Sequence, residues 1–107
     1  MSGDRLQRIL DQLTKTIKDR FDPERIILFG SYARDEAGDD SDLDLLVVMP
    51  TSLSKRRAAV EIGLALHDIP MAKDIVVSTP EEFAWRKDVT GTIEYPAVRE
   101  GRVLYAK

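Results

Sequence analysis

Hydrophobic residues recur at helical spacing in the first twenty positions of the chain. They occupy positions i, i+3, i+4, i+7 and i+11, which form one stripe along a helix; these residues are Leu6, Ile9, Leu10, Leu13 and Ile17. The sequence Phe21-Asp22-Pro23 ends this helix, because the residue before a proline is driven out of the helical region. The pattern therefore predicts an amphipathic helix that ends near residue 21.

Short apolar runs follow, and they predict strands. Residues 25–29, 43–48 and 73–78 are each an apolar run of strand length, and the first is read as buried on both faces. Turn-forming residues at 37–41 separate the first two runs. Residues 102–105 predict a last strand at an edge of the sheet.

Helical signals lie between these strands. Residues 32–37 predict a short helix that opens from Gly30-Ser31, and residues 54–67 predict a longer one. Thr79, Pro80 and Glu82 match an N-cap, a first-turn proline and a capping box for a helix to about residue 87, in which Phe83 and Trp85 are expected to pack. Residues 92–100 predict a helix disturbed by Pro96 and capped by Gly101. This alternation indicates an α/β or α+β fold with helices packed on one sheet, in a single domain over residues 1–107.

The composition and net charge of the chain exclude some classes of protein and of chemistry. The chain has 107 residues, of which 43% are hydrophobic and 33% are charged, as in ordinary globular proteins. The net charge of -3 gives no general attraction to nucleic acid, and the absence of cysteine excludes disulfides and thiolate chemistry. Because no membrane span or signal peptide is evident, a cytoplasmic location is expected.

An acidic loop precedes the second predicted strand. Six carboxylates fall between residues 35 and 44: Asp35, Glu36, Asp39, Asp40, Asp42 and Asp44. The first four are interpreted as a solvated loop. Asp42 and Asp44 are two apart at the entry to a strand, so both side chains lie on one face of that strand. Such a pair either has one raised pKa or holds a cation, and Mg²⁺ binds one or two carboxylates together with phosphate oxygens. A calcium-binding loop is excluded, because Leu45 and Thr51 occupy the positions of its glycine and glutamate.

Two further features complete a candidate site. Gly30-Ser31 follows a predicted strand and opens a predicted helix, where backbone N–H groups and the serine hydroxyl can hold phosphate. Asp74 interrupts an apolar strand near its start. Three carboxylates from two neighbouring strands can hold the two metal ions of a phosphoryl or nucleotidyl transfer site.

The spacing of Gly30-Ser31, Asp42-x-Asp44 and a later Asp74 resembles the nucleotidyltransferase superfamily that includes DNA polymerase beta. The pieces GSYAR and SDLDLLV and the tail AVREGRVLYAK resemble its minimal members, which are commonly antitoxins paired with a HEPN-domain toxin. The resemblance implies a mixed sheet with flanking helices. It also implies that Gly30 and Ser31 hold the β- and γ-phosphates, and that Asp42, Asp44 and Asp74 bind two Mg²⁺ ions, with Asp74 helping to activate the acceptor. Family members usually carry glycine at the position of Asp35.

The expected function is Mg²⁺-dependent transfer of AMP from ATP to a tyrosine hydroxyl of a HEPN toxin, with the chain acting as antitoxin. Two alternatives remain open. In the first, the chain neutralises its partner by steric contact, with a weak or idle active site. In the second, it modifies a small molecule of the aminoglycoside type. No nucleic acid or membrane partner is expected.

Overall fold

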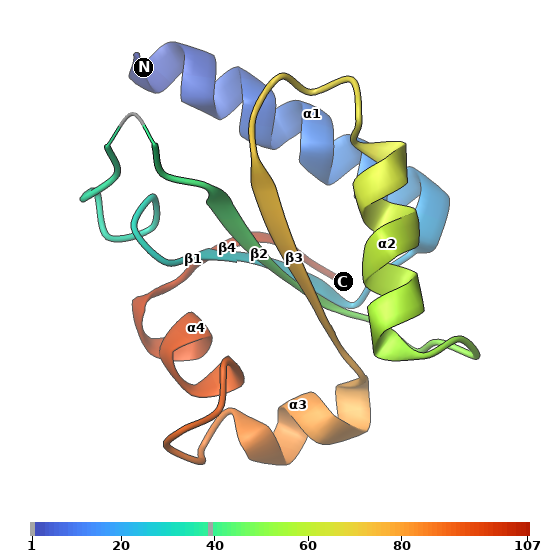
Figure 1. Cartoon of the computed structure of the whole chain (residues 1–107). Helices are drawn as coiled ribbons and strands as arrows, with labels where there is room; N and C mark the ends of the chain where they lie inside the picture. Colours follow the sequence, from blue (N-terminus) through green and yellow to red (C-terminus); the bar gives the residue numbers. More distant parts are fainter. Residues whose placement is uncertain (1, 39) are drawn as a thin grey trace.

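The computed structural model describes residues 2–38 and 40–107 and contains one sheet between two pairs of helices (Figure 1). The strands lie in the order β3-β2-β1-β4. The elements in chain order are α1 (Gly3–Phe21), β1 (Arg25–Phe29), β2 (Leu43–Val48), α2 (Lys55–Ala65), β3 (Lys73–Ser78), α3 (Pro80–Arg86), α4 (Glu94–Glu100) and β4 (Arg102–Ala106). This arrangement confirms the predicted α+β class, a mixed sheet with flanking helices.

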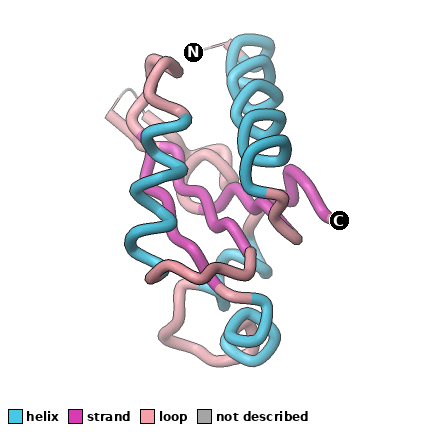
Figure 2. Tube along the Cα trace, turned by 90° about the vertical axis from the view of Figure 1, so that its right-hand side faces the viewer, coloured by secondary structure: helices cyan, strands magenta, loops and turns pink. Residues whose placement is uncertain are grey.

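The two faces of the sheet carry separate apolar clusters. On one face, α1 and α2 pack against the side chains of Ile26, Leu28, Leu43, Leu45 and Val47. On the other face, Phe83 of α3 and Ala97 of α4 pack against Ile27, Leu46 and Val48. Figure 2, turned by 90°, shows the strands between these two layers of helices. Because β1 and β2 are covered on both sides, their unbroken apolar sequences are explained.

The three main strands have the predicted bounds. β1 pairs with β2 in antiparallel orientation, and β2 pairs with β3 in parallel orientation. β4 completes the sheet as an antiparallel edge strand beside β1. The end of β1 therefore lies beside the beginnings of β2 and β3.

The short helix predicted at residues 32–37 is wrong, and the segment forms turns instead. The N–H groups of Ala33 and Arg34 both donate to the carbonyl of Gly30, at 3.1 and 3.2 Å. Asp35 then takes a left-handed backbone conformation with φ of 61°, and the N–H of Glu36 donates to Ser31 O at 2.9 Å. A residue in this region cannot continue a right-handed helix, so only one turn forms.

Helix termini mostly follow their local signals. Ser2, Ser54 and Thr79 cap α1, α2 and α3 by accepting a hydrogen bond from the N–H three residues later. The helix predicted at residues 54–67 is shorter and ends at Ala65, which leaves His67 beyond it. In α3, Phe83 is buried as expected, whereas Trp85 is 57% exposed and does not pack in the core.

Pro96 does not disturb α4, contrary to the prediction. It is the third residue of this helix, where a backbone N–H would have no partner within the helix. Gly101 follows the helix with an extended backbone, and its N–H donates to Ala97 O at 3.0 Å. A Cβ at Gly101 would lie 2.7 Å from Ile27 Cγ2 and 2.9 Å from Leu28 O. Glycine is needed here because the chain passes close to β1.

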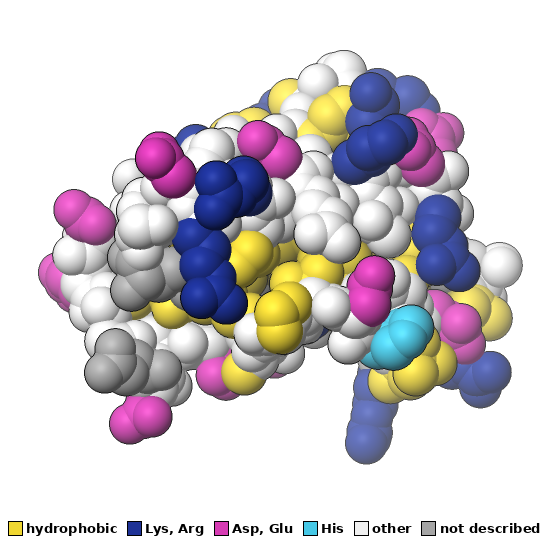
Figure 3. Space-filling model, turned by 90° about the horizontal axis from the view of Figure 1, so that it is seen from above, with side chains coloured by type: hydrophobic (Ala, Val, Ile, Leu, Met, Phe, Trp, Pro, Cys, Tyr) yellow, Lys and Arg dark blue, Asp and Glu magenta, His cyan; other side chains and the backbone are white. Residues whose placement is uncertain are grey.

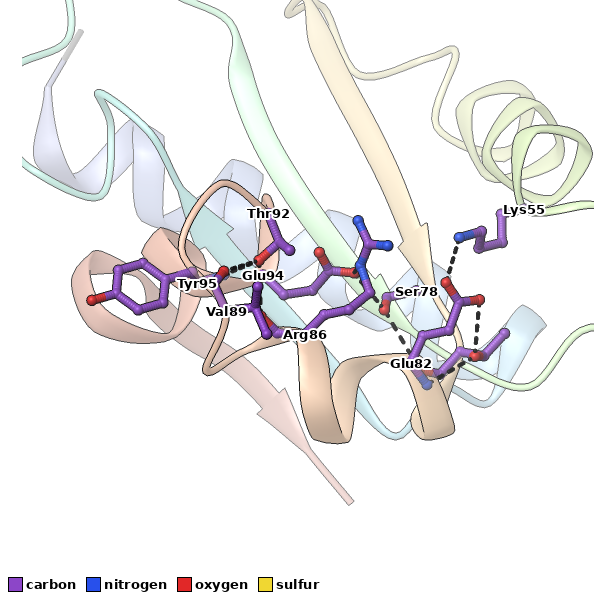
Figure 4. Close-up of polar contacts among 9 residues, drawn as sticks. Lys55, Ser78, Glu82, Arg86, Val89, Thr92, Glu94 and Tyr95 are labelled. Atoms are coloured by element: carbon purple, nitrogen blue, oxygen red, sulfur yellow. Dashed lines mark hydrogen bonds and ion pairs between the residues drawn. The ribbon is translucent and has the colours of Figure 1, made fainter.

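A buried polar cluster joins α3, α4 and the end of β3 (Figure 4). The Glu94 carboxylate is 4% exposed, and its Oε2 accepts hydrogen bonds from Ser78 Oγ at 2.9 Å and from Arg86 Nε at 3.1 Å. Thr92 Oγ1 accepts from the N–H of Tyr95 at 3.2 Å and so supports the start of α4. These contacts hold α4 against the sheet.

None of the helices in the described part of the chain combines the length and apolar character that a bilayer crossing requires.

Candidate functional site

The predicted site residues meet at one end of the sheet. Gly30 directly follows β1, Asp42 and Asp44 lie at the start of β2, and Asp74 is the second residue of β3. In the sheet register, Asp44 lies beside Phe29 on one side and beside Asp74 on the other. The strand pairing thus places Asp44 between the glycine turn and the third carboxylate.

The carboxylates of β2 and β3 share a face. Leu43 and Leu45 point into the cluster beneath α1 and α2, so Asp44 points to the opposite face, as do Leu46 and Val48. Asp74 shares its face with Val76, which packs against the α3–α4 side. Asp42 is exposed just before the strand. The two strands therefore present Asp44 and Asp74 side by side, as the sequence predicted for adjacent strands.

Asp44 is the carboxyl group of the site whose pKa is shifted. Its pKa is raised above the ordinary value of 3.8, first because the carboxyl is partly buried, and then because Asp74 and Asp42 repel its negative charge. Arg34 opposes this effect and lowers the pKa of Asp44. The repulsion expected between Asp42 and Asp44 therefore raises the pKa of Asp44, which is the more buried of the two. Asp74 adds to this repulsion.

Gly30 has the conformation and the space that only glycine provides. Its φ is 75°, and a Cβ built on it would overlap Oδ2 of Asp44. The backbone of the turn after β1 therefore lies directly against the carboxylate of β2. A phosphate above this turn would lie beside the same carboxylate.

The turn at Gly30-Ser31 keeps part of the predicted phosphate-binding character. The N–H groups of Ala33 and Arg34 are engaged by Gly30 O, and the dipole of a full helix is missing, because the segment is a turn. The close backbone approach at Gly30 and the half-buried Ser31 hydroxyl remain.

Arg34 and Glu100 form an ion pair at this end of the sheet. Arg34 Nε donates to Glu36 Oε2 at 3.2 Å, and its Nη1 donates to Glu100 Oε2 at 3.5 Å. Glu100 is the last residue of α4, 66 positions along the chain from Arg34. No local sequence signal reveals such a contact. It brings the only cation that influences the pKa of Asp44 to this end of the sheet, among the described residues.

The rest of the acidic loop behaves as a solvated loop. Asp35, Glu36 and Asp40 are exposed. Asp39, placed in the same group by the sequence, lies outside the described residues. Of the residues in the turn expected at 37–41, Gly38 and Ser41 bond to each other: the N–H of Ser41 donates to Gly38 O at 3.1 Å, and the N–H of Gly38 donates to Ser41 Oγ at 2.9 Å.

The carboxylate oxygens of the candidate site are suitable ligands for a Mg²⁺ ion that substrate phosphates also bind. Within residues 2–38 and 40–107, no three acidic or histidine side chains converge to enclose one ion by themselves. Repulsion among carboxylates favours side-chain rotamers that keep them apart. Mg²⁺ does not need a protein cage, since it binds one or two carboxylates and completes its shell with water and substrate phosphates. Asp44, its neighbours Asp42 and Asp74, and the open turn at Gly30 suit this mode.

Comparisons with known proteins cover the same part of the chain. The nucleotidyltransferase domain family matches residues 10–98, which include all the residues of the site. A protein of Methanocaldococcus jannaschii is 46% identical over 66 residues, which cover 60% of this chain and 43% of that protein. Protein adenylyltransferase MntA of Thermococcus cleftensis is 45% identical over 42 residues, covering 39% of this chain and 42% of MntA. The chain thus matches less than two thirds of the length of these relatives.

Solved structures share the fold. A toxin–antitoxin complex with AMP-PNP superposes with a TM-score of 0.59 and 20% identity, covering 92% of this chain and 73% of that chain. A tri-AMPylated HEPN toxin of Shewanella oneidensis in complex with MNT antitoxin gives a TM-score of 0.55 and 20% identity, covering 94% of this chain and 72% of that chain. Since the family match spans most of the sequence, the chain belongs to the nucleotidyltransferase domain family.

Proposed function

We propose that the chain transfers AMP from ATP to a hydroxyl group of a protein partner. The observation that carries this proposal is the position of Asp44, which lies between the close backbone turn at Gly30 and the neighbouring carboxylate Asp74. Three carboxylates in close proximity repel one another, and divalent cations shared with a polyphosphate would offset that repulsion.

The residues divide the work as follows. Gly30 and Ser31 hold the β- and γ-phosphates of ATP. Asp42, Asp44 and Asp74 are the residues that would hold two Mg²⁺ ions together with the phosphate oxygens, and Asp74 also orients the acceptor hydroxyl and accepts its proton. When bound, Mg²⁺ would neutralise charge on the phosphates as it is redistributed during transfer.

The reaction forms one bond and breaks one. The acceptor oxygen bonds to the α-phosphorus, the bond from the α-phosphorus to the bridging oxygen breaks, and pyrophosphate leaves with both electrons of that bond. The acceptor proton passes to Asp74 and then to solvent. The products are an AMP ester of the acceptor, pyrophosphate and a proton.

The partner follows from the names of the relatives. One is called a protein adenylyltransferase, and two proteins with the same fold were solved as toxin–antitoxin complexes. For this chain we infer a HEPN-type toxin whose tyrosine accepts AMP, with the chain acting as antitoxin in the cytoplasm, where ATP is available.

The test is intact-mass measurement of the purified partner after incubation with the chain, Mg²⁺ and ATP. The wild type should add the mass of one or more AMP groups. Asp42→Asn and Asp44→Asn should abolish the addition, whereas Asp40→Asn, an exposed residue of the same loop, should preserve it. If the chain suppresses toxicity while the double variant does so equally well, the steric alternative is correct. Efficient modification of an aminoglycoside would establish the small-molecule alternative.

A further inference from the structure

Glu100 lies at the same end of the sheet as the candidate site, although it belongs to the last helix. It is the final residue of α4, and Arg102, at the start of β4, pairs with Leu28 near the end of β1 (Figure 1). A Cβ at Gly101 would lie 2.9 Å from Leu28 O, so the backbone next to Glu100 passes directly against β1. The position of Glu100 is therefore set by the packing of the sheet and not by the acidic loop.

The guanidinium of Arg34 is held by two carboxylates. Its Nε donates to Glu36 Oε2 at 3.2 Å, and its Nη1 donates to Glu100 Oε2 at 3.5 Å. Glu36 belongs to the same turn as Arg34, so only Glu100 ties the guanidinium to the sheet. Neither contact uses Nη2. Because an arginine has five N–H donors in a fixed fork, the remaining donors are available to a ligand.

A cation is needed at this turn if it is to hold phosphates. The backbone N–H of Arg34 donates to Gly30 O at 3.2 Å, so Arg34 is part of the turn that we propose to approach the nucleotide. The phosphates would add negative charge beside carboxylates that already repel one another. On the face seen from above in Figure 3, Lys and Arg side chains lie among acidic ones and do not form one basic patch. Among the described residues, Arg34 is the only cation that lowers the pKa of Asp44, and a guanidinium suits phosphate oxygens.

We propose that Glu100 is a positioning residue, which holds Arg34 at the Gly30-Ser31 turn and leaves the remaining guanidinium N–H groups free for the β- and γ-phosphates. This inference rests on the proposed function and assigns a role in it to the end of α4. Glu100 acts through Arg34 and does not touch the nucleotide. Because the Arg34 side chain is long and 40% exposed, it would lose more rotamer freedom on binding phosphate without this contact.

The sign of the effect separates this role from its opposite. A carboxylate that competed with the phosphates for Arg34 would weaken nucleotide binding, and its removal would lower the Kd. A carboxylate that positions Arg34 strengthens binding, and its removal raises the Kd. The test is therefore calorimetric measurement of the Kd for Mg²⁺ and AMP-PNP in the wild type, Arg34→Ala, Glu100→Ala and the double variant.

Arg34→Ala should raise this Kd by about tenfold or more, and Glu100→Ala by about fivefold. The double variant should bind no more weakly than Arg34→Ala alone, because two residues that act through one contact are not additive. Glu100→Gln, which keeps an oxygen that accepts from Arg34, should recover part of the loss. A purely structural role of Glu100 would give neither the missing additivity nor this recovery.

Two measurements guard against an indirect effect. The melting temperature of Glu100→Ala should stay close to that of the wild type, because an ion pair between exposed side chains contributes little to stability. Glu61→Ala is the matched control, since Glu61 also pairs with an arginine, Arg57, at 3.2 Å on the surface of α2. It should leave the Kd for Mg²⁺ and AMP-PNP unchanged.

Three results would overturn the inference: a Kd of Glu100→Ala below that of the wild type, an unchanged Kd in either single variant, or additive losses in the double variant. If the wild type binds Mg²⁺ and AMP-PNP with the expected pattern but transfers no AMP to a protein, the proposed function fails and the positioning role of Glu100 stands. If the wild type does not bind the nucleotide at all, both are refuted.

Discussion

Gly30 and Asp44 face each other across the β1–β2 pair so closely that a single methyl group on Gly30 would overlap the Asp44 carboxylate. The turn that we propose to approach the phosphates and the carboxylate that we propose to bind their cations are therefore one structural unit. A substitution at either Gly30 or Asp44 should therefore change the position of the other residue.

Gly30→Ala should impair nucleotide binding beyond its effect on stability. The positive φ at Gly30 costs about 1–2 kcal/mol for alanine, and the new methyl must also displace Asp44. The Kd for Mg²⁺ and AMP-PNP, measured by calorimetry, should rise by about tenfold or more.

Gly91→Ala is the matched control for this variant. Gly91 has a φ of 93°, but a Cβ there would meet open space. It should lower the stability by a similar amount and leave the Kd unchanged. Equal effects of the two variants on binding would mean that the contact with Asp44 has no role in the site.

Asp44→Asn should stabilise the metal-free protein at neutral pH and not at acid pH. Because the folded-state pKa of Asp44 is raised above 3.8, ionising this carboxyl opposes folding. The wild type therefore loses this contribution as the pH rises from the unfolded pKa through the folded pKa. The melting temperature of Asp44→Asn should exceed that of the wild type by a few degrees at pH 7, and the difference should vanish near pH 3.

Asp40→Asn, in the same loop but exposed, serves as the comparison and should show no such pH-dependent gain. Adding Mg²⁺ and AMP-PNP should reverse the order, because a ligand that binds only the folded state stabilises the protein that binds it more tightly. A variant that is less stable than the wild type at pH 7 would contradict this account of Asp44.

Asp35→Gly should be more stable than Asp35→Ala by about 1 kcal/mol. Both substitutions remove the same exposed charge, but only glycine adopts a φ of 61° without strain. Chemical denaturation of both variants measures the difference, and equal midpoints would show that the turn relaxes without a left-handed residue.

Arg86→Ala should destabilise the fold far more than Lys55→Ala. Arg86 donates to the Glu94 carboxylate, which is 4% exposed and whose Oε1 has no hydrogen-bond partner within the described residues. Removing the cation leaves a buried charge, at a cost of about 2–4 kcal/mol.

Lys55 forms an ion pair with Glu82 at 2.7 Å, but both side chains are partly exposed, so its loss should cost less than about 1 kcal/mol. Denaturant midpoints distinguish the two variants. Similar small losses would show that Glu94 relaxes toward solvent and that the contacts drawn in Figure 4 do little to hold α4 against the sheet.

The sequence by itself determined those features that depend on neighbouring residues. β1, β2 and β3 begin and end where their apolar runs do, and Ser54 and Thr79 cap helices because the hydroxyl and the N–H that it accepts from are three residues apart. The alternation of side chains along a strand likewise placed Asp44 on the face opposite Leu43 and Leu45. Predictions of secondary structure were wrong where the backbone conformation of a single residue decided the structure. At Asp35, a left-handed φ ended the helix expected after Gly30.

The tertiary structure decided which of these pieces touch. Asp74 lies beside Asp44 only because β3 pairs with β2 in parallel and in register, and Gly30 reaches Asp44 only because β1 runs antiparallel to β2. Glu100 meets Arg34 across 66 residues. Strand register and direction depend on how the whole core packs, because a pairing is favoured only if it buries the apolar faces of several elements at once. The sequence therefore supplied the chemical groups of the site, and the packing of the sheet brought them together.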